Sequence, residues 1–349
     1  MKRVVILVST LKIGGAEKQS IYLLNALKDT YETYLIVYHG DIIDHKNMHL
    51  IEGNNYDLVK LNGHLLKKLY SLYKLFRAKH VTHLFTYLTK TNLYGSIIAK
   101  CAGVKYTYIS VRNSYLPGWK VILEKIAAFL STGIIFNSHL GEILFKQKGF
   151  KNTVVIPNCF ANISAPFKRA HKDTINIITV GRFVAQKDYF TAIKAVKQLK
   201  NTLGNFIFQI VGYGELENRI RKMIIDLGLK QNIEILISPG NITGLLNQAD
   251  IYLSTSIFEG TSNSIMEAMN ACLPIVATNV GDNSRLISDG VSGFLHNVGD
   301  YVAIAESLNE LIDNYDLRIN MGMASNKILK EYYSFKKFQN TYLTLVNKS

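Results

Sequence analysis

The sequence predicts an α/β protein with two parallel β-sheets. Short apolar runs typical of buried strands alternate with longer segments of helical spacing, and this alternation occurs twice along the 349 residues. A polar stretch that contains prolines, from Pro157 to Thr174, separates the two series and is the predicted linker. We therefore expect domains at residues 1–165 and 166–327, and a C-terminal helix within 328–349 that packs back on the first domain.

The predicted strands are runs rich in β-branched, leucine and aromatic residues, which suits strands buried inside a sheet. In the first half they are Val4–Val8, Thr33–Tyr38, His83–Thr86, Tyr106–Val111 and Gly133–Asn137. In the second half they are Ile175–Val180, Phe206–Val211, Ile233–Ile237, Ile251–Ser254 and Pro274–Ala277. Segments with helical spacing are Glu17–Leu27, Leu65–His80, Asn92–Ala102, Val121–Leu130, Tyr189–Lys200, Leu216–Leu227, Ile242–Gln248, Ser264–Ala271 and Ile328–Leu345.

The predicted helix Leu65–His80 is amphipathic. Its apolar side chains fill an arc of about 120°, and its basic side chains lie outside that arc. The apolar set is Leu65, Leu66, Leu69, Leu72, Tyr73 and Phe76, and the basic set is Lys67, Lys68, Lys74, Arg77 and Lys79. This pattern fits a core-facing helix with a basic outer surface, and it also fits a helix that lies on an anionic membrane.

The composition is that of a globular protein, with 48% hydrophobic and 19% charged residues. No apolar run reaches the roughly 18 residues of a membrane span, and Val4–Val8 is too short for the core of a signal peptide. The cysteines Cys101, Cys159 and Cys272 are far apart and odd in number, which favours neither a disulfide framework nor a metal site. We expect a protein of the reducing cytoplasm.

Positive charge is concentrated in the first half of the chain. The net charge is +14; residues 1–165 carry 21 basic and 9 acidic side chains, whereas residues 166–349 carry 19 and 17. The first half therefore suits an anionic partner. A membrane surface fits better than nucleic acid, because the aromatic residues lie in apolar runs rather than among surface lysines.

The segment Phe258–Glu267 carries the most specific functional pattern. Small polar residues follow the predicted strand Ile251–Ser254 and lead into a helix N-terminus, where free N–H groups and the helix dipole suit a phosphate. Glu259 in the loop and Glu267 on the helix would reach different parts of one ligand, and carboxylates suit sugar or ribose hydroxyls. The segment predicts a sugar-nucleotide pocket; two solvated surface carboxylates are the alternative.

Other turns that follow predicted strands carry cations or glycines. Arg182 and Lys187 lie five apart in the loop after Ile175–Val180, where they can grip a diphosphate from two sides. The glycines at such turns are Gly14, Gly15, Gly181 and Gly212. Their spacing is not G-x-G-x-x-G, which argues against a nicotinamide or flavin dinucleotide. A plain turn or a solvated basic loop is the alternative explanation.

In this order, the motifs resemble those of the large retaining glycosyltransferase family called group 1, or family 4, whose members have the GT-B fold. The matching elements span nearly the whole chain: Gly14–Glu17, Val155–Asn158, Val180–Lys187, Val211–Gly214, Ala249–Asp250, Glu259–Met269, Pro274–Thr278 and Asp289–Leu295. The second-half motifs are highly specific, and the first-half motifs are much less so. The resemblance implies two Rossmann-like domains facing a central cleft, with ligands at the carboxyl ends of both sheets.

The resemblance also implies roles for individual residues. Arg182 and Lys187 would hold the donor diphosphate and stabilise charge on the departing nucleotide, while Glu259 would contact the donor sugar and Glu267 the ribose. The other expected donor contacts are Gly15, Gly181, Gly212, Ile237, Ser238, Gly260, Thr261, Ser262, Asn263, Ser264 and Ile265. Family members need no metal, because fixed cations and a helix dipole can stabilise the leaving group. We therefore expect no cofactor besides the nucleotide sugar.

Two positions depart from the family pattern. Many relatives have a histidine after the fifth strand of the first domain, near the donor sugar, where this chain has Arg112 or Asn113. Together with Gly14, these residues are the expected acceptor or sugar-side contacts, and a cation there suggests an anionic acceptor. The usual Lys-Gly of the donor loop is Lys187-Asp188 in this chain.

The combined expectation is a hexosyl- or N-acetylhexosaminyl-transferase that uses a UDP-sugar donor and a lipid-linked or oligosaccharide acceptor. The setting would be bacterial surface polysaccharide assembly (capsule, O-antigen or exopolysaccharide), on the inner face of the plasma membrane. The alternatives are a GDP-sugar-dependent mannosyltransferase of the same family, a sugar-nucleotide epimerase on the same fold, and a non-catalytic glycan-binding partner subunit.

Overall fold

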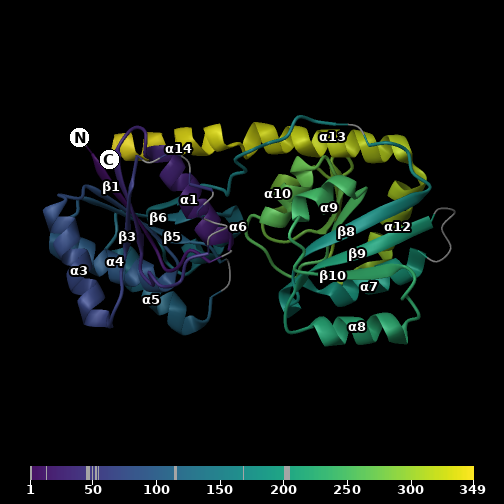
Figure 1. The fold of residues 1–349 in the computed structure, drawn as a ribbon, viewed down its shortest axis with the longest axis horizontal. Helices are drawn as coiled ribbons and strands as arrows, with labels where there is room; N and C mark the ends of the chain where they lie inside the picture. Colours follow the sequence, from purple (N-terminus) through teal and green to yellow (C-terminus); the bar gives the residue numbers. More distant parts are fainter. Residues whose placement is uncertain are drawn as a thin grey trace. The chain divides into compact units, whose positions relative to one another are not determined.

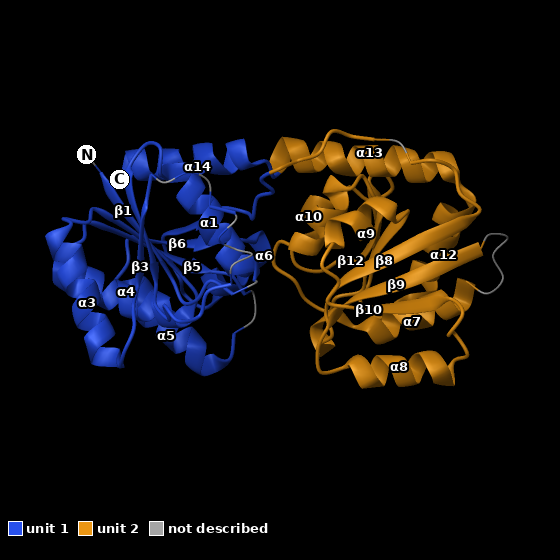
Figure 2. Cartoon of the chain, in the orientation of Figure 1, with its two compact units in different colours: residues 1–161, 333–349 blue, residues 162–332 orange. Residues whose placement is uncertain are grey.

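The computed structural model describes residues 2–12, 14–44, 48, 50–51, 53, 55–113, 116–167, 169–199 and 205–349. The chain divides into two compact units (Figure 2). Unit 1 comprises Met1–Ala161 and Tyr333–Ser349, and unit 2 comprises Asn162–Tyr332. The segment predicted as a single C-terminal helix is in fact the end of α13 (Tyr315–Tyr332) and all of α14 (Phe335–Lys348), separated where Ser334 caps α14.

Unit 1 contains a seven-stranded parallel sheet with the order β3-β2-β1-β4-β5-β6-β7. The strands are β1 (Arg3–Val8), β2 (Glu32–Val37), β3 (Asp57–Lys60), β4 (His83–Tyr87), β5 (Tyr106–Val111), β6 (Gly133–Phe136) and β7 (Thr153–Val155). The two edge strands, β3 and β7, were not predicted. Both are short and at most partly buried, so they lack the apolar run that identifies a central strand.

Helices cover both faces of this sheet (Figure 1). α1 (Gly15–Leu27) and α14 pack on one face, against Val4, Ile6 and Val8 of β1. α3 (Leu65–Ala78), α4 (Thr89–Ala102), α5 (Gly118–Phe129) and α6 (His139–Gln147) pack on the other, and α4 contacts both α3 and α5. Within the described residues, no helix of either unit is long and apolar enough to cross a bilayer.

Helix α3 differs from the predicted amphipathic arc. Its buried positions are Lys68, Leu72 and Phe76. Leu65, Leu66 and Tyr73 were expected in the apolar arc but are exposed, and Lys68 was expected outside it but is buried with its ammonium 4.8 Å from the centroid of the Tyr38 ring. The prediction was wrong because the buried side chains of α3 form a single row four residues apart, with the partly buried Leu75 beside it.

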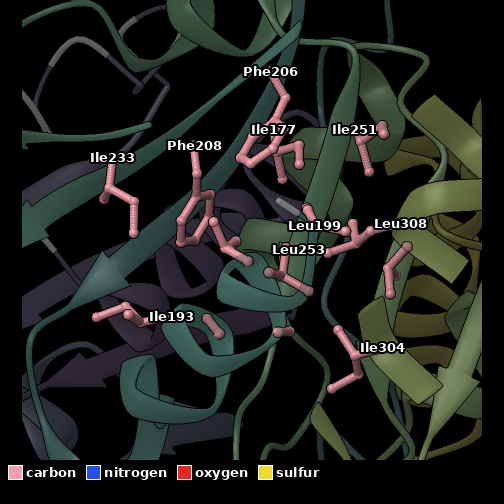
Figure 3. Packing of buried hydrophobic residues seen from close by; sticks show 14 of the residues in the cluster. Ile177, Ile193, Leu199, Phe206, Phe208, Ile233, Ile251, Leu253, Ile304 and Leu308 are labelled. Carbon is pink, nitrogen blue, oxygen red and sulfur yellow. The ribbon is translucent and has the colours of Figure 1, made fainter. Parts of the chain in front are cut away.

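Unit 2 contains a six-stranded sheet with the order β10-β9-β8-β11-β12-β13, again parallel. The strands are β8 (Thr174–Arg182), β9 (Asn205–Tyr213), β10 (Ile233–Ile237), β11 (Ile251–Ser254), β12 (Ile275–Thr278) and β13 (Gly293–His296). The helices and short turns are η1 (Ala185–Lys187), α7 (Tyr189–Gln198), α8 (Glu217–Asp226), α9 (Ile242–Gln248), α10 (Asn263–Asn270), α11 (Asn283–Leu286) and α12 (Tyr301–Asp313). Figure 3 shows the core in which Ile177 and Leu253 of the sheet pack with Ile304 and Leu308 of α12.

The strand order of each sheet reverses once. In unit 2 the chain runs outward from β8 through β9 to β10, then returns to place β11 on the other side of β8. In unit 1 the same reversal separates β1 from β4. Loops at the carboxyl ends of the two strands that flank such a reversal diverge, and ligands bind in the crevice between them. In unit 2 these loops are the ones after β8 and β11.

His83, the first residue of β4, carries a buried imidazole that stacks on Tyr106 with 4.9 Å between ring centroids. Burial, with smaller contributions from Lys2 and Lys105, lowers the pKa of His83 to about 4. The unfolded chain therefore takes up this proton near its ordinary pKa of about 6.5, before the folded chain does. Stability is lost as the pH falls through this window.

We expect the substitution His83→Phe, which keeps an aromatic ring in the stack, to flatten the acid dependence of stability. The parent protein should lose up to about 3 kcal/mol more than the variant between pH 6.5 and 4. Thermal unfolding midpoints measured across this range check the difference. Parallel acid profiles for the two proteins would show that His83 is not the titrating group.

Candidate functional site

Hydrogen bonds join the loops that follow β8 and β11. The Thr255 hydroxyl lies 3.1 Å from the carbonyl oxygen of Lys187 and 2.8 Å from that of Asp188. The Ile257 N–H donates to the carbonyl of Gln186 at 2.8 Å. These contacts hold the two loops side by side at the reversal in strand order, although they lie about 70 residues apart in the chain.

Lys187 and Glu259, two of the predicted catalytic residues, meet across this junction. The Lys187 Nζ lies 2.6 Å from Glu259 Oε1, and the Ser256 hydroxyl donates to the same oxygen at 2.8 Å. Only 20% of the Lys187 side chain and 10% of the Glu259 side chain are exposed. The pair is largely shielded from water, so its attraction is stronger than that of a surface ion pair.

Arg182 is the last residue of β8, where it pairs with Tyr213 of β9. The sequence placed it in the following loop, and this was wrong because the strand continues through Gly181. The side chain is exposed. Among the described residues, none accepts a hydrogen bond from its guanidinium or pairs with its charge, so Arg182 supplies a second cation at the same strand end as Lys187.

Gly181, Gly212 and Ile237 lie in register on the three neighbouring strands β8, β9 and β10. A Cβ on Gly212, where φ is +154°, would lie 1.8 Å from the Gly181 carbonyl oxygen. Ser238 follows with φ +44°, and its N–H donates to the Gly212 carbonyl at 3.1 Å. The close approach of the two backbones is therefore sufficient to require a glycine at position 212, with or without a ligand. Ile237 and Ser238 lie at the same edge of the sheet.

Helix α10 starts directly after the loop that contains Glu259, as the sequence predicted. Its N-cap is Ser262, whose side chain does not cap the helix and instead lies 3.2 Å from the Ser264 hydroxyl. A helix leaves its first N–H groups without intrahelical acceptors, so this N-terminus suits an anion. The loop that follows β12 holds the segment that begins at Gly260. There the N–H of Asp282, the N-cap residue of α11, donates to the Gly260 carbonyl at 3.3 Å.

The remaining predicted donor contacts differ in exposure. Thr261, Ser262 and Ile265 are buried, whereas Asn263, Ser264 and Glu267 are partly exposed. Burial raises the pKa of the Tyr252 phenol, and the negative charges of Glu267 and Glu259 raise it further. Both carboxylates therefore act electrostatically on one buried phenol.

The predicted residues of unit 1 lie at its own strand ends. Gly14 is the N-cap of α1, which begins at Gly15. A Cβ on Gly14 would lie 2.3 Å from Glu17 Oε2, and the Thr10 hydroxyl donates to Glu17 Oε1 at 3.1 Å. This helix start already carries a carboxylate, which weakens its attraction for an anionic ligand.

Arg112 follows β5 and is 9% exposed. Its Nη1 donates to Asn158 Oδ1 at 3.1 Å, and its guanidinium lies 4.6 Å from the centroid of the Tyr87 ring. No carboxylate among the described residues pairs with it. Asn113 is exposed. The side chain of Arg112 links β4, β5 and the segment after β7, and its contact with an acceptor stays a prediction.

Sequence reasoning missed Thr255 and Ser256, the two hydroxyl residues that position Lys187 and Glu259. The available signal was a pair of polar residues directly after a buried strand, Ile251–Ser254. Among the described residues, no cluster of three or more His, Cys, Asp or Glu side chains has the arrangement of a metal site.

Comparison with known proteins identifies the family to which unit 2 belongs. Residues 163–328 match the family model described as glycosyl transferases group 1, a range that covers nearly all of unit 2. Residues 163–328 therefore form a group 1 glycosyltransferase domain. Its sequence is 26% identical over 309 residues to the UDP-Gal:alpha-D-GlcNAc-diphosphoundecaprenol alpha-1,3-galactosyltransferase of Escherichia coli, covering 80% of each chain.

A second similar protein is from Campylobacter jejuni. It is the GalNAc-alpha-(1->4)-GalNAc-alpha-(1->3)-diNAcBac-PP-undecaprenol alpha-1,4-N-acetyl-D-galactosaminyltransferase, which is 22% identical over 332 residues and 91% of each chain. Among solved structures, HepE of Anabaena in complex with UDP superposes with a TM-score of 0.86 over all of both chains, at 18% identity. This likeness shows that the two-sheet α/β architecture is the GT-B fold.

We expect Gly212→Ala to destabilise unit 2 because the added Cβ overlaps the Gly181 carbonyl and must push β9 away from β8. The matched control is Gly228→Ala, at φ +67° with nothing within 4 Å of a Cβ, which should cost only the conformational penalty of about 1 kcal/mol. Gly212→Ala should cost about 3 kcal/mol or more. Denaturant titration measures both, and equal losses would show that the close approach does not constrain Gly212.

Proposed function

We propose that this glycosyltransferase moves a hexosyl or N-acetylhexosaminyl group from a UDP-sugar to a lipid-linked saccharide, with retention at the anomeric carbon. The reaction would take place at the cytoplasmic face of the plasma membrane, in the assembly of a bacterial surface polysaccharide. The observation that carries the proposal is the shielded Lys187–Glu259 pair beside the N-terminus of α10.

The donor half of the reaction needs positive charge where the nucleoside diphosphate departs. Arg182 and Lys187 lie at the carboxyl edge of one sheet, and the start of α10 adds a third electropositive group. Groups fixed by a sheet and by interloop hydrogen bonds stabilise developing charge without reorganising. We therefore assign the diphosphate to these groups, and the proposal needs no metal ion.

Glu259 and Glu267 complete the donor assignment. Once the diphosphate binds Lys187, Glu259 would exchange its bond with this lysine for contacts with the sugar hydroxyls. Glu267, which lies on α10, would bind the ribose. A carboxylate accepts two hydroxyl hydrogen bonds readily, and such charge-assisted bonds are stronger than neutral ones. The nearby hydroxyl of Ser256 keeps Glu259 oriented throughout.

The comparisons support the choice of donor and acceptor. Solved structures of HepE contain UDP and UDP-glucose, and the Escherichia coli relative is named for UDP-Gal. The acceptors named for the Escherichia coli and Campylobacter jejuni relatives are sugars on undecaprenol diphosphate or diphosphoundecaprenol. The basic first half of this chain suits an acceptor that carries a diphosphate and resides in a membrane.

We expect Lys187→Met and Glu259→Gln each to lower the rate of sugar transfer by about 100-fold or more, because each removes a fixed charge from the reacting centre. The double variant should lose little beyond the single ones, since the two side chains act as a unit. The matched control is Glu217→Gln with Arg221→Met, which removes an exposed ion pair at 2.9 Å on α8. Release of UDP in the presence of acceptor measures the rate, and undiminished transfer in both single variants would refute the site.

We expect UDP to raise the thermal unfolding midpoint and GDP to leave it nearly unchanged, because a ligand stabilises only the protein that binds it. At a concentration 100 times its Kd, UDP should add about 2.7 kcal/mol. Arg182→Met should weaken the UDP response without lowering the midpoint of the free protein, since its guanidinium is exposed. If GDP raised the midpoint and UDP did not, the donor would be a GDP-sugar and not a UDP-sugar.

A further inference from the structure

The outer surface of α5 in unit 1 is apolar and exposed. Trp119, Ile122, Ile126 and Phe129 recur at spacings of three and four, which places them within about 80° on one side of the helix. Their exposed fractions are 59%, 60%, 44% and 90%. Single exposed apolar residues are common on proteins, but four in a row along one helix mark an interaction surface.

The buried side of α5 contains a carboxylate and a small residue in place of large apolar side chains. Its buried residues are Glu124 and Ala127. The Glu124 carboxylate accepts hydrogen bonds from Asn92 Nδ2 at 2.9 and 3.2 Å, and burial raises the pKa of Glu124. The helix therefore turns a carboxylate inward and its largest apolar side chains outward, so the exposed stripe is not a core surface.

Helix α3, in the same layer of helices, also has exposed apolar residues. Leu65, Leu66, Tyr70 and Tyr73 are exposed there, by 45%, 72%, 63% and 37%. α4, which contacts both α3 and α5, adds Ile97 at 38%. We call the exposed apolar residues of these three helices the α3–α5 surface: Leu65, Leu66, Tyr70, Tyr73, Ile97, Trp119, Ile122, Ile126 and Phe129.

The exposed charged residues of these three helices have one sign. The basic residues on the three helices, apart from the buried Lys68, are Lys67, Lys74, Arg77, Lys90, Lys100, Lys120 and Lys125. The acidic residue within the same helices is Glu124, which is buried. A surface with lysines around tryptophan, tyrosine and isoleucine matches an anionic bilayer, where basic residues meet phosphates and aromatic rings sit at the headgroup level.

We propose that the α3–α5 surface docks on an anionic phospholipid leaflet, with the stripe of α5 inserted between the lipids and the lysines at the phosphates. The inference rests on the proposed lipid-linked acceptor, because docking would bring unit 1 to the layer in which that acceptor resides. A second copy of the chain fits less well, since a symmetric dimer through this surface would bring like charges together.

The protein reports on its own docking, because Trp119 is its only tryptophan. Vesicles that contain phosphatidylglycerol should shift the tryptophan emission to the blue, and brominated acyl chains in those vesicles should quench it. Phosphatidylcholine vesicles should do neither, and salt should weaken the response. An unchanged spectrum with anionic vesicles, or an equal shift with neutral ones, would overturn the proposal.

Substitution tests which side chains insert. Ile122→Asp with Phe129→Asp places carboxylates on exposed positions of the stripe and should reduce cosedimentation with anionic vesicles at least 10-fold, while the unfolding midpoint stays unchanged. Ile225→Asp, on α8 of unit 2 and similarly exposed at 53%, is the control that should bind as the parent does.

The docking variant should retain the stabilisation by UDP, which separates a failure of docking from a failure of the donor site. Full vesicle binding by the docking variant would overturn the proposal. So would the finding that the parent protein is a dimer without vesicles and that the variant is a monomer, since a second copy would then be the occupant of this surface.

Discussion

The candidate site depends on the hydrogen bonds that join the loops after β8 and β11. The two strands are neighbours in the sheet but distant in the sequence, so the sheet brings their loops together and the Thr255 hydroxyl fixes them through the carbonyls of Lys187 and Asp188. Lys187 and Glu259 then meet at 2.6 Å without any ligand. Electrostatic stabilisation of a leaving group is effective when the charges are fixed before reaction, because no free energy is spent on orienting them. Loss of the interloop hydrogen bonds would leave the charges of Lys187 and Glu259 unchanged, but the two side chains would no longer be held in a fixed position.

The two units use charge in different ways. Unit 2 is nearly neutral over its half of the chain, and Lys187 and Glu259 of its site form a shielded ion pair, with the Ser256 hydroxyl on the same carboxylate oxygen, while Arg182 is exposed. Unit 1 carries an excess of lysines that are mostly exposed and unmatched by acids along α3, α4 and α5. A matched and shielded set selects one small ligand by geometry, whereas a diffuse positive surface attracts an extended anion without fixing its position. This contrast agrees with a soluble donor on one unit and an acceptor held in a lipid layer near the other.

The central strands and the positions of the donor motif along the chain were predictable from sequence. Which strands are neighbours in the sheet, and which motif residues contact one another, were not. Buried strands such as β1 and β5 show uninterrupted apolar runs, while β3, β7 and β13 are short and partly solvated, so nothing in their sequence separates them from loops. Glu259 and Lys187 were each identified from their position after a strand, but their direct contact was not predicted, because the adjacency of β8 and β11 is a property of topology. The burial of Arg112 was not predictable, since it depends on the Tyr87 ring and on Asn158, which lie elsewhere in the chain.

Helix α5 shows a further limit of predictions from periodicity. The spacing of apolar residues shows which side of a helix is apolar, but it does not show which side faces the core. The α5 pattern fits an ordinary core-facing helix, yet the helix is rotated so that Glu124 reaches the Asn92 amide. Turning the stripe inward would break this bond and leave the buried Asn92 amide without its carboxylate acceptor, which is unfavourable away from water. The bond between Glu124 and Asn92 therefore fixes the rotation of α5, and the apolar stripe stays outside. Exposed apolar area of this size is unfavourable in water by about 25 cal/mol per Å². A surface that covers it in the working enzyme would recover that free energy, and the surrounding lysines limit the choice to an anionic one.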